Sequence, residues 1–448
     1  MGSEEGLRPA HGHSLLVDLY ELTMAASYHA EGMNQPATFD LFFRELPPTR
    51  NFLVSCGLEQ ALAYLEHLHF EEPDLAFLRS LGLFSEDFLD FLDFVEFTGD
   101  VWAVPEGEVV FPPAPVLSVT APLIQAQIAE TYLLNCLNFS TAVASKAARV
   151  TIACEGRPFA DFSARRDHGP DAALLAARAA FVGGAQSTSN VLAGKQFGIP
   201  LSGTMAHSYV LAFPDEAAAF RAFARRFPEQ AVLLIDTFDT LEGARRAAEV
   251  ASELAPEGIA IRAVRIDSGD LAELAAGVRR ILDGAGHPEI GILASGDLDE
   301  ERIAALLDAG APINGFGVGT RLGTSQDAPS LGAVYKLVED PTGPKYKRST
   351  GKATLPGRKQ VWRSYDAAMP GVPAADLIAP VDEPGPPGAR PLLELCMQGG
   401  RRTGQNPPLL VLRERCRRSV ETLPDHLRSL GAAPAYPVEL APSLRTEP

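Results

Sequence analysis

The chain has 448 residues, of which 46% are hydrophobic and 21% are charged, and its 39 lysines and arginines against 57 aspartates and glutamates give a net charge of −18. This composition is typical of a folded globular protein and excludes a largely disordered chain. The negative charge repels nucleic acid and anionic membrane surfaces, so we expect neither as a partner, and an anionic substrate would need a local basic pocket.

The five cysteines are far apart in the sequence and never form a C-x-x-C pair. The sequence therefore predicts neither a zinc ribbon nor a disulfide framework. Residues 1–14 lack the apolar segment of a secretory signal, and no apolar run is long enough to cross a membrane. We expect a soluble protein of the cytoplasm.

The N-terminal part of the chain is predicted to be a small α/β domain. Residues 14–30 carry apolar side chains at helical spacing behind a possible Ser14 cap, and residues 38–43 are typical of a strand. Prolines between residues 105 and 115 disfavour both helix and central strand. We therefore expect domains at 1–120, 121–335 and 336–448, with the last packing back on the first.

Strand and helix candidates alternate regularly in the middle of the chain. Such alternation predicts an α/β fold with a parallel sheet covered by helices, and the number of units favours an irregular α/β barrel over an open, doubly wound sheet. The strand candidates are 158–164, 181–182, 199–203, 231–236, 259–266, 290–294 and 313–318; the helix candidates are 170–180, 215–227, 241–254, 271–283 and 299–309.

Polar residues and glycines follow four of these strand candidates, where we expect each strand to end. The carboxyl ends of parallel strands meet at one face of the sheet, so these residues should lie together and form a site. They are His207 after 199–203, Asp267 after 259–266, Ser295 and Asp297 after 290–294, and Gly317, Gly319 and Thr320 at the end of 313–318.

Each of these residues also has a structural explanation. The Gly317–Thr320 segment can bind a phosphate through backbone N–H groups or form only a tight turn. Asp267 can hold Mg²⁺ or a ribose, or can simply pair with Arg265, and Asp297 can serve as a helix cap. His207 can be a general base, a phosphate ligand, a phosphoryl acceptor or a structural histidine of a loop. Residue types alone leave these alternatives open.

A further strand end carries an aromatic residue and basic residues. Phe162 and Arg165 can sandwich and neutralise a planar acid, because the ring offers a stacking face and the guanidinium a positive charge. We expect the neighbouring Arg166 to pair with Asp167 at the surface instead, and His168 to be structural.

Taken in order, the motifs resemble those of the nicotinate phosphoribosyltransferase family. The resemblance rests on residues 18–24, 39–44, 202–208, 265–270 and 326–337. It implies a type II phosphoribosyltransferase fold, with an irregular α/β barrel and an α/β sandwich domain built from both ends of the chain. The implied enzyme makes nicotinate mononucleotide and pyrophosphate from nicotinate and phosphoribosyl pyrophosphate in NAD biosynthesis, with coupled hydrolysis of ATP.

The same resemblance implies a role for each site residue. His207 is the residue phosphorylated by ATP, and Arg265 and Asp267 complete the catalytic set, with Mg²⁺ held at Asp267 through pyrophosphate or water. Tyr20 reaches the pyridine ring from a neighbouring subunit, so a homodimer with shared active sites is implied. Phosphoribosyl pyrophosphate is expected at Arg265, Ser295, Asp297, Gly317, Gly319 and Thr320, and nicotinate at Tyr20, Thr204, Arg165, Phe162 and Ser187.

Two alternatives stay open. Nicotinamide phosphoribosyltransferase shares the architecture but carries an acid where Ser187 stands, and a neutral serine avoids repelling the carboxylate of nicotinate. A metal-dependent barrel lyase or aldolase would also use Asp267, Asp297 and a phosphate loop. It would need a lysine or a further histidine inside the barrel, and Lys195 is the nearest candidate.

Overall fold

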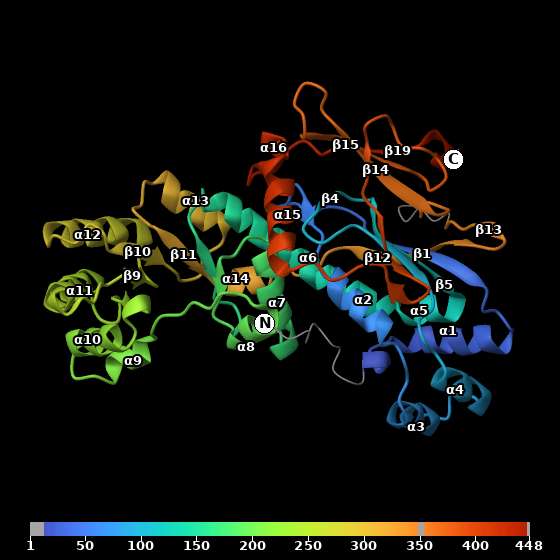
Figure 1. Cartoon of the computed structure of the whole chain (residues 1–448), viewed down its shortest axis with the longest axis horizontal. Coiled ribbons are helices and arrows are strands. Elements are labelled where there is room, and N and C mark those ends of the chain that lie inside the picture. The colour runs from blue at the N-terminus through green and yellow to red at the C-terminus, as the bar shows by residue number, and fades with distance from the viewer. Residues whose placement is uncertain (1–12, 348–353, 446–448) are drawn as a thin grey trace. The chain divides into compact units, whose positions relative to one another are not determined.

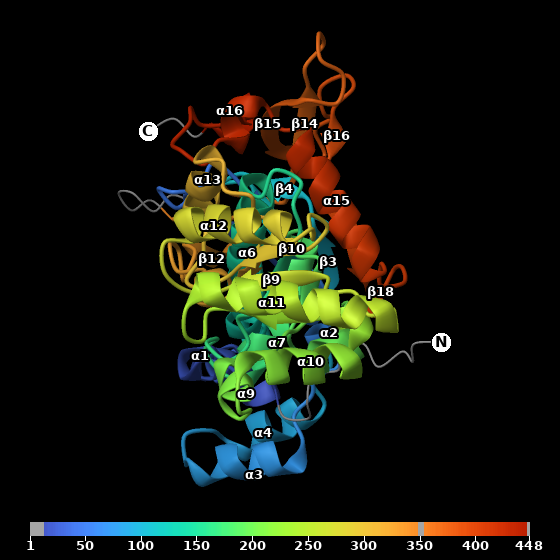
Figure 2. The same ribbon diagram turned by 90° about the vertical axis from the view of Figure 1, so that its left-hand side faces the viewer.

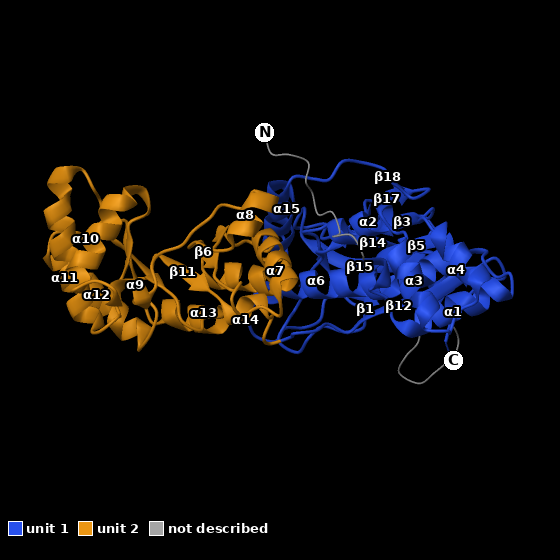
Figure 3. Cartoon of the chain, turned by 90° about the horizontal axis from the view of Figure 1, so that it is seen from below, with its two compact units in different colours: residues 1–145, 328–448 blue, residues 146–327 orange. Residues whose placement is uncertain are grey.

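The computed structural model describes residues 13–347 and 354–445, so the expectation about the N-terminal leader falls largely outside the described residues. Contacts divide the chain into two compact units, unit 1 with residues 1–145 and 328–448 and unit 2 with residues 146–327 (Figure 3). The boundaries expected from the sequence, at residues 120 and 335, fall within two strands of unit 1, β5 (Pro115–Pro122) and β12 (Ala333–Asp340).

Unit 1 is built around a seven-stranded sheet to which both ends of the chain contribute (Figure 1). Leu41 pairs with Leu117 on one side and with Tyr335 on the other, and all three side chains are buried. Residues far apart in the sequence thus form one core. The strand order is β13 (Gly343–Pro344), β12, β1 (Pro36–Phe43), β5, β3 (Asp100–Ala103), β17 (Glu394–Gln398) and β18 (Arg401–Arg402).

The remaining elements of unit 1 are two smaller sheets and several helices. A four-stranded sheet has the order β16 (Arg390–Pro391), β14 (Lys359–Tyr365), β15 (Pro373–Pro380) and β19 (Val438–Leu440), and β2 (Leu53–Val54) pairs with β4 (Val109–Val110). The helices are α1 (Leu19–Ala30), α2 (Leu58–Glu66), α3 (Glu72–Ser80), α4 (Glu86–Asp93), α5 (Leu123–Ile128), α15 (Leu409–Glu421) and α16 (Asp425–Arg428). Helix α6 (Glu130–Ala153) begins in unit 1 and ends in unit 2.

The first helix starts later than the sequence predicted. Ser14 does not cap it, because the Ser14 hydroxyl donates to the carbonyl oxygen of His69 and residues His13–Leu15 form a separate 3-10 turn. Asp18 takes the N-cap position, and α1 begins at Leu19. No helix in the described ranges combines the length and the apolarity needed to cross a membrane.

Helix α1 buries a carboxyl group, Glu21, which is 0% exposed. Thr131 Oγ1 lies 2.7 Å from Glu21 Oε1, while Oε2 has no hydrogen-bond partner among the described residues. Burial raises the pKa of Glu21 from 4.5 to about 7, against the opposing effect of the Thr131 hydrogen bond.

The free energy of unfolding should therefore depend on pH through Glu21. Between pH 4.5 and about 7 the folded protein keeps a proton that the unfolded chain has released, so stability falls as the pH rises through this range and is constant above it. The loss is at most about 3 kcal/mol. Glu21→Gln should remove this fall, as measured by urea unfolding followed by circular dichroism. Glu31→Gln, at the exposed end of the same helix, is the control, and an unchanged pH profile in Glu21→Gln would contradict the assignment.

Unit 2 contains a six-stranded parallel sheet. This confirms the predicted mixed α/β fold with parallel strands. Among the described residues the two edge strands of the sheet do not pair with each other, so the sheet is open along that side. The order is β7 (Ser187–Thr188), β6 (Phe159–Asp161), β11 (Gly315–Val318), β10 (Gly291–Ala294), β9 (Ala263–Ile266) and β8 (Val232–Leu234).

Helices connect these strands, and several begin at an acidic cap. Asp215, Asp239, Asp270 and Asp299 each accept a backbone N–H in the first turn of the helix that follows. Figure 2 shows α10, α11 and α12 side by side across the sheet. The helices are α7 (Pro170–Val182), α8 (Val191–Phe197), α9 (His207–Leu211), α10 (Glu216–Arg226), α11 (Thr240–Leu254), α12 (Leu271–Gly284), α13 (Glu300–Asp308) and α14 (Thr320–Gly323).

Two predicted strands of this unit are wrong. Residues 181–182 are the last turn of α7, because a short buried apolar pair is equally compatible with a helix that ends before two glycines. Residues 199–203 form only a single bridge, between Leu201 and Thr188, since Pro200 has no N–H to donate to a ladder.

Candidate active site

A cavity of about 630 Å³ opens in unit 2 where the strands β6, β9, β10 and β11 end. This volume is typical of sites for small molecules. The cavity is lined by most of the residues that the sequence singled out: Phe162, Arg165, Thr204, His207, Arg265, Asp267, Ser295, Asp297, Gly317, Gly319 and Thr320.

His207 is the first residue of α9 and does not end a strand as predicted. Its Nδ1 atom lies 3.2 Å from the hydroxyl of Thr237. The structure gives its Nε2 atom no hydrogen-bond partner among the described residues, and the side chain lines the cavity. The ring is therefore held through one nitrogen, and the other can react.

Arg265 comes from β9 and brings a largely buried positive charge to the cavity. Its Nη2 donates to the carbonyl oxygen of Met205 at 3.1 Å, but its Nε is buried without a hydrogen-bond partner among the described residues. Burial lowers the pKa of Arg265, and the carboxylates of Asp267 and Asp236 oppose this effect. A buried donor without an acceptor is costly, so this side chain is suited to an anionic ligand.

Asp267 and Asp236 form a pair of carboxylates beside this arginine. Asp267 Oδ1 accepts a 2.5 Å hydrogen bond from Ser295, and Asp236 Oδ2 accepts from the Asp267 backbone N–H at 3.0 Å and from Ser268 at 2.7 Å. Asp236 Oδ1 is buried without a hydrogen-bond partner among the described residues. Sequence reasoning missed Asp236, although it ends a candidate strand in the same way as Asp267.

The glycine at position 317 makes room for an aromatic ring. A Cβ atom on Gly317 would lie 2.5 Å from two ring atoms of Phe162, closer than any real contact. At Gly319 the nearest contact would be the carbonyl oxygen of Phe162, at 3.2 Å. The glycines therefore let Phe162, the residue after β6, pack closely against β11, whether or not their N–H groups bind a phosphate.

Two exposed arginines, Arg165 and Arg166, also line the cavity. The expected surface pair of Arg166 with Asp167 is wrong. The Asp167 carboxylate accepts instead from the Ser163 hydroxyl at 3.0 Å, and burial raises its pKa to about 6. Both guanidinium groups are thus available to a negatively charged ligand.

Three further residues that line the cavity have local contacts. The hydroxyl of Thr204 donates to the carbonyl oxygen of Met205 at 3.2 Å. Thr320 begins α14, and its carbonyl oxygen accepts from the Thr324 hydroxyl at 2.6 Å. Asp297 has a left-handed backbone, with φ at +54°, and its carboxylate binds two arginines.

Known proteins are similar to this chain in both sequence and structure. Residues 15–138 match the nicotinate phosphoribosyltransferase (NAPRTase) N-terminal domain, and residues 158–340 match the nicotinate phosphoribosyltransferase (NAPRTase) family. A nicotinate phosphoribosyltransferase of Mycobacterium tuberculosis is 48% identical over 96% of this chain and 92% of its own length. The chain belongs to the nicotinate phosphoribosyltransferase family. The likeness extends to a nicotinate phosphoribosyltransferase of Bacillus subtilis, 44% identical over 78% of this chain and 73% of its own length.

A solved structure supports the same assignment. The crystal structure of human nicotinic acid phosphoribosyltransferase is similar with a TM-score of 0.84 and 29% identity, over 96% of this chain and 98% of that one. This nicotinate phosphoribosyltransferase family member is therefore an enzyme, and the lyase or aldolase alternative is excluded. Lys195, the lysine on which that alternative rested, lies exposed on α8 and does not line the cavity.

Two residues expected to bind nicotinate do not line the cavity of this family member. The Ser187 hydroxyl, at the edge strand β7, donates to the Ser202 hydroxyl at 2.8 Å. Tyr20 belongs to unit 1, where it lies on α1 with 48% of its surface exposed. Their expected roles stay predictions.

The carboxylates near Arg265 fit a magnesium ion that would be bound partly by the protein and partly by a substrate. Mg²⁺ in nucleotide-type sites commonly takes one or two carboxylates and completes its shell with phosphate and water oxygens. Asp267 lines the cavity, and Asp236, which does not line it, accepts from the Asp267 backbone N–H and has an unpartnered buried oxygen. No group of three acidic, histidine or cysteine side chains in residues 13–347 and 354–445 is arranged to hold a metal alone.

Proposed function

We propose that this enzyme transfers the phosphoribosyl group of phosphoribosyl pyrophosphate to nicotinate and couples the transfer to ATP hydrolysis through phosphorylation of His207. The observation that carries the proposal is the convergence of His207, Arg265 and Asp267 on one cavity in a chain of this family. The product, nicotinate mononucleotide, is an intermediate of NAD biosynthesis.

Nicotinate is proposed to lie against the Phe162 ring. An aromatic face suits the planar pyridine, and Arg165 at the same strand end suits its carboxylate. Arg166 and Thr204 line the same cavity and supply further donors. Such a cationic pocket favours nicotinate over nicotinamide, which carries no charge.

Phosphoribosyl pyrophosphate is proposed to lie between Arg265 and the loops after β10 and β11. The unpartnered Nε of Arg265 suits a phosphate oxygen, whereas the carboxylate of Asp297 suits a ribose hydroxyl, because two like charges would repel. Magnesium bound at Asp267 and Asp236 would neutralise charge on the pyrophosphate leaving group.

The transfer itself requires little covalent chemistry from the protein. The pyridine nitrogen attacks ribose C1, the bond from C1 to the pyrophosphate oxygen breaks, and its electron pair leaves with pyrophosphate. Stacking on Phe162 fixes the direction of attack, and Arg265 stabilises the leaving charge. In the coupled step His207 Nε2 attacks the γ-phosphorus of ATP and ADP leaves, and water later hydrolyses the phosphohistidine to inorganic phosphate.

Phosphorylation of His207 explains how ATP can affect substrate binding. It adds negative charge and acceptor oxygens near Arg265 and the carboxylate pair, and so changes the electrostatics of the pocket. We further propose that two chains form a homodimer in which the exposed Tyr20 of one covers the pyridine ring in the other. In this proposal the open sheet of unit 2 is part of an irregular barrel, and unit 1 is the sandwich domain.

The proposal is tested by product formation from phosphoribosyl pyrophosphate and Mg²⁺. Nicotinate, nicotinamide and quinolinate are each supplied with and without ATP. We expect turnover of nicotinate that ATP stimulates. Turnover of nicotinamide alone would overturn the choice of substrate, and no turnover of any of the three would overturn the proposed activity.

Gly317→Ala should weaken nicotinate binding more than phosphoribosyl pyrophosphate binding. The added Cβ would displace the Phe162 ring, whose atoms lie 2.5 Å from its position. We expect KM for nicotinate to rise about tenfold, measured at saturating phosphoribosyl pyrophosphate. Gly284→Ala, where nothing lies within 4 Å, is the matched control. A rise confined to KM for phosphoribosyl pyrophosphate would show that the residue acts on the phosphate side.

A further inference from the structure

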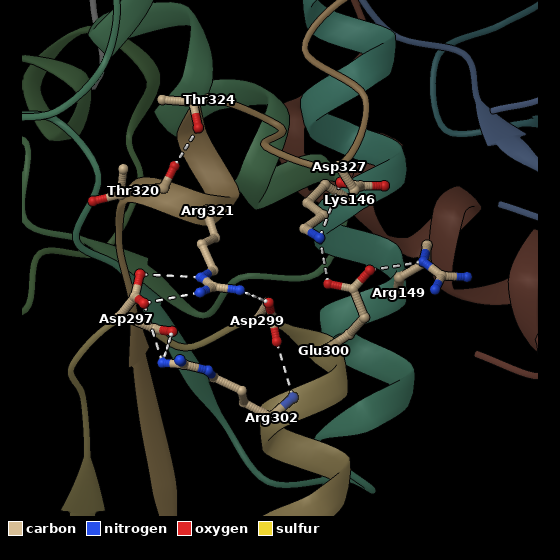
Figure 4. A network of polar contacts seen from close by, with 10 residues as sticks. All are labelled: Lys146, Arg149, Asp297, Asp299, Glu300, Arg302, Thr320, Arg321, Thr324 and Asp327. Carbon is tan, nitrogen blue, oxygen red and sulfur yellow. Dashed lines mark hydrogen bonds and ion pairs between the residues drawn. The ribbon is translucent and has the colours of Figure 1, made fainter. Parts of the chain in front are cut away.

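One guanidinium joins the loop after β10 to α14, the helix that follows β11. Arg321, the second residue of α14, donates from Nε to Asp297 Oδ1 at 3.0 Å and from Nη2 to Asp297 Oδ2 at 2.9 Å. Its Nη1 donates to Asp299 Oδ2 at 2.5 Å (Figure 4). All three nitrogens of this side chain therefore donate to two carboxylates that follow β10. Only the planar guanidinium of arginine can make this set of contacts.

Asp297 needs such support, because its backbone is held in a disfavoured conformation. Its φ of +54° is uncommon for a residue with a Cβ atom. Arg302 adds a second guanidinium, whose Nη1 donates to the Asp297 carbonyl oxygen at 2.9 Å and to Oδ2 at 3.1 Å. The pairing also holds the pKa of Asp297 below its usual range.

The contacts leave Asp297 little acceptor capacity. A carboxylate offers about four acceptor positions. Arg321 fills two of them and Arg302 fills a third, while the residue still lines the cavity. The remaining position can accept one hydrogen from a ligand. A sugar hydroxyl supplies such a hydrogen, and a phosphate oxygen does not.

We propose that Arg321 is a positioning residue for phosphoribosyl pyrophosphate, which fixes the Asp297 carboxylate so that its free acceptor position meets a ribose hydroxyl. This inference rests on the proposed function. Arg321 does not itself line the cavity and so acts through Asp297. It also ties residues 317–320, which immediately precede it at the end of β11 and the start of α14, to the loop of Asp297.

Helix α13 has a second anchor besides the contact of Arg321 with its N-cap residue, Asp299. Glu300, its first residue, lies 2.6 Å from Lys146 Nζ and 2.9 Å from Arg149 Nε, and Lys146 also lies 3.0 Å from Asp327 (Figure 4). The two ion pairs of Glu300 are buried and hold the start of the helix from the side of α6. Loss of Arg321 should therefore loosen the Asp297 loop and leave the helix in place.

The test compares the full-length wild type with Arg321→Ala, Arg321→Lys and the control Arg245→Ala, which removes an exposed arginine paired on α11. Steady-state kinetics give kcat and both KM values, and circular dichroism gives the melting temperature. We expect Arg321→Ala to raise KM for phosphoribosyl pyrophosphate about tenfold, with KM for nicotinate unchanged within about twofold. In Arg321→Lys the KM for phosphoribosyl pyrophosphate should lie between the values of the wild type and Arg321→Ala, because lysine cannot form the bidentate contact.

A double variant separates positioning from general stability. In an Asp297→Ala background, the further change Arg321→Ala should have less than about a twofold effect on KM for phosphoribosyl pyrophosphate. An unchanged KM in folded Arg321→Ala overturns the inference. An equal rise in both KM values also overturns it. The same holds if Arg321→Ala raises KM by the full amount in the Asp297→Ala background. If Arg321→Ala does not fold, Arg321→Lys decides by the same criteria. A wild type without any transfer overturns the proposed function, and this inference with it.

Discussion

His207→Ala is expected to abolish the stimulation of nicotinate turnover by ATP while leaving a slow, ATP-independent transfer. The Phe162, Arg265 and Asp267 side chains that would hold the two substrates come from other elements, so the pocket survives the change. Only the imidazole that we propose as the phosphoryl acceptor is lost. Product formation with and without ATP, and release of inorganic phosphate, measure the two effects separately.

After incubation with radiolabelled ATP, the wild type should also carry a labelled phosphoryl group that is stable to alkali and labile to acid. His207→Ala should lack this label. His168→Ala is the matched control, because this exposed histidine lies six residues after Phe162 and does not line the cavity. Full ATP stimulation in His207→Ala would remove this residue from the coupling. Thr237→Val should reduce stimulation only in part, since it removes the hydroxyl near Nδ1 and keeps the ring.

The order of strands and helices in unit 2 could be predicted because it depends on local patterns. The buried strands β9, β10 and β11 are short apolar runs, and aspartates cap the helices that follow the first two. The failures came where a local pattern allowed two structures, as at residues 181–182, or where a proline removed a donor, as at Pro200. Pairing between the N- and C-terminal strands of unit 1 involves residues about 300 apart, which no local pattern specifies.

The position of the site could be predicted because the ends of the strands could be predicted. The pattern of polar residues just after apolar runs identified Asp267, Ser295 and the glycines of β11. The topology of a parallel sheet brings the carboxyl ends of such strands together. The contacts that decide what each residue can do are tertiary. The packing of Phe162 on Gly317 and the ion pair of Arg321 with Asp297 each join two segments that are far apart in the sequence. Asp297 was considered as a cap, whereas Asp299 caps the helix.

Asp267→Asn is expected to lower kcat/KM at least about 10²-fold, because it removes the negative charge that would organise magnesium and pyrophosphate. The change keeps the size of the side chain and an oxygen that can accept from Ser295. The loss is therefore one of charge and not of packing.

Asp270→Asn in the same loop provides the control for this variant. Asp270 Oδ1 accepts the backbone N–H groups of Ala272 and Glu273, each at 3.1 Å, and asparagine caps a helix about as well as aspartate. This control should keep nearly full activity, although it removes the same charge three residues away. Raising the Mg²⁺ concentration should restore part of the activity of Asp267→Asn but not change the control. Near-normal turnover in Asp267→Asn would contradict the prediction. It would mean that the Asp267 carboxylate only holds Ser295 and the loop in place. The charge of the metal would then be balanced by another group, and Asp236 is the carboxylate that remains.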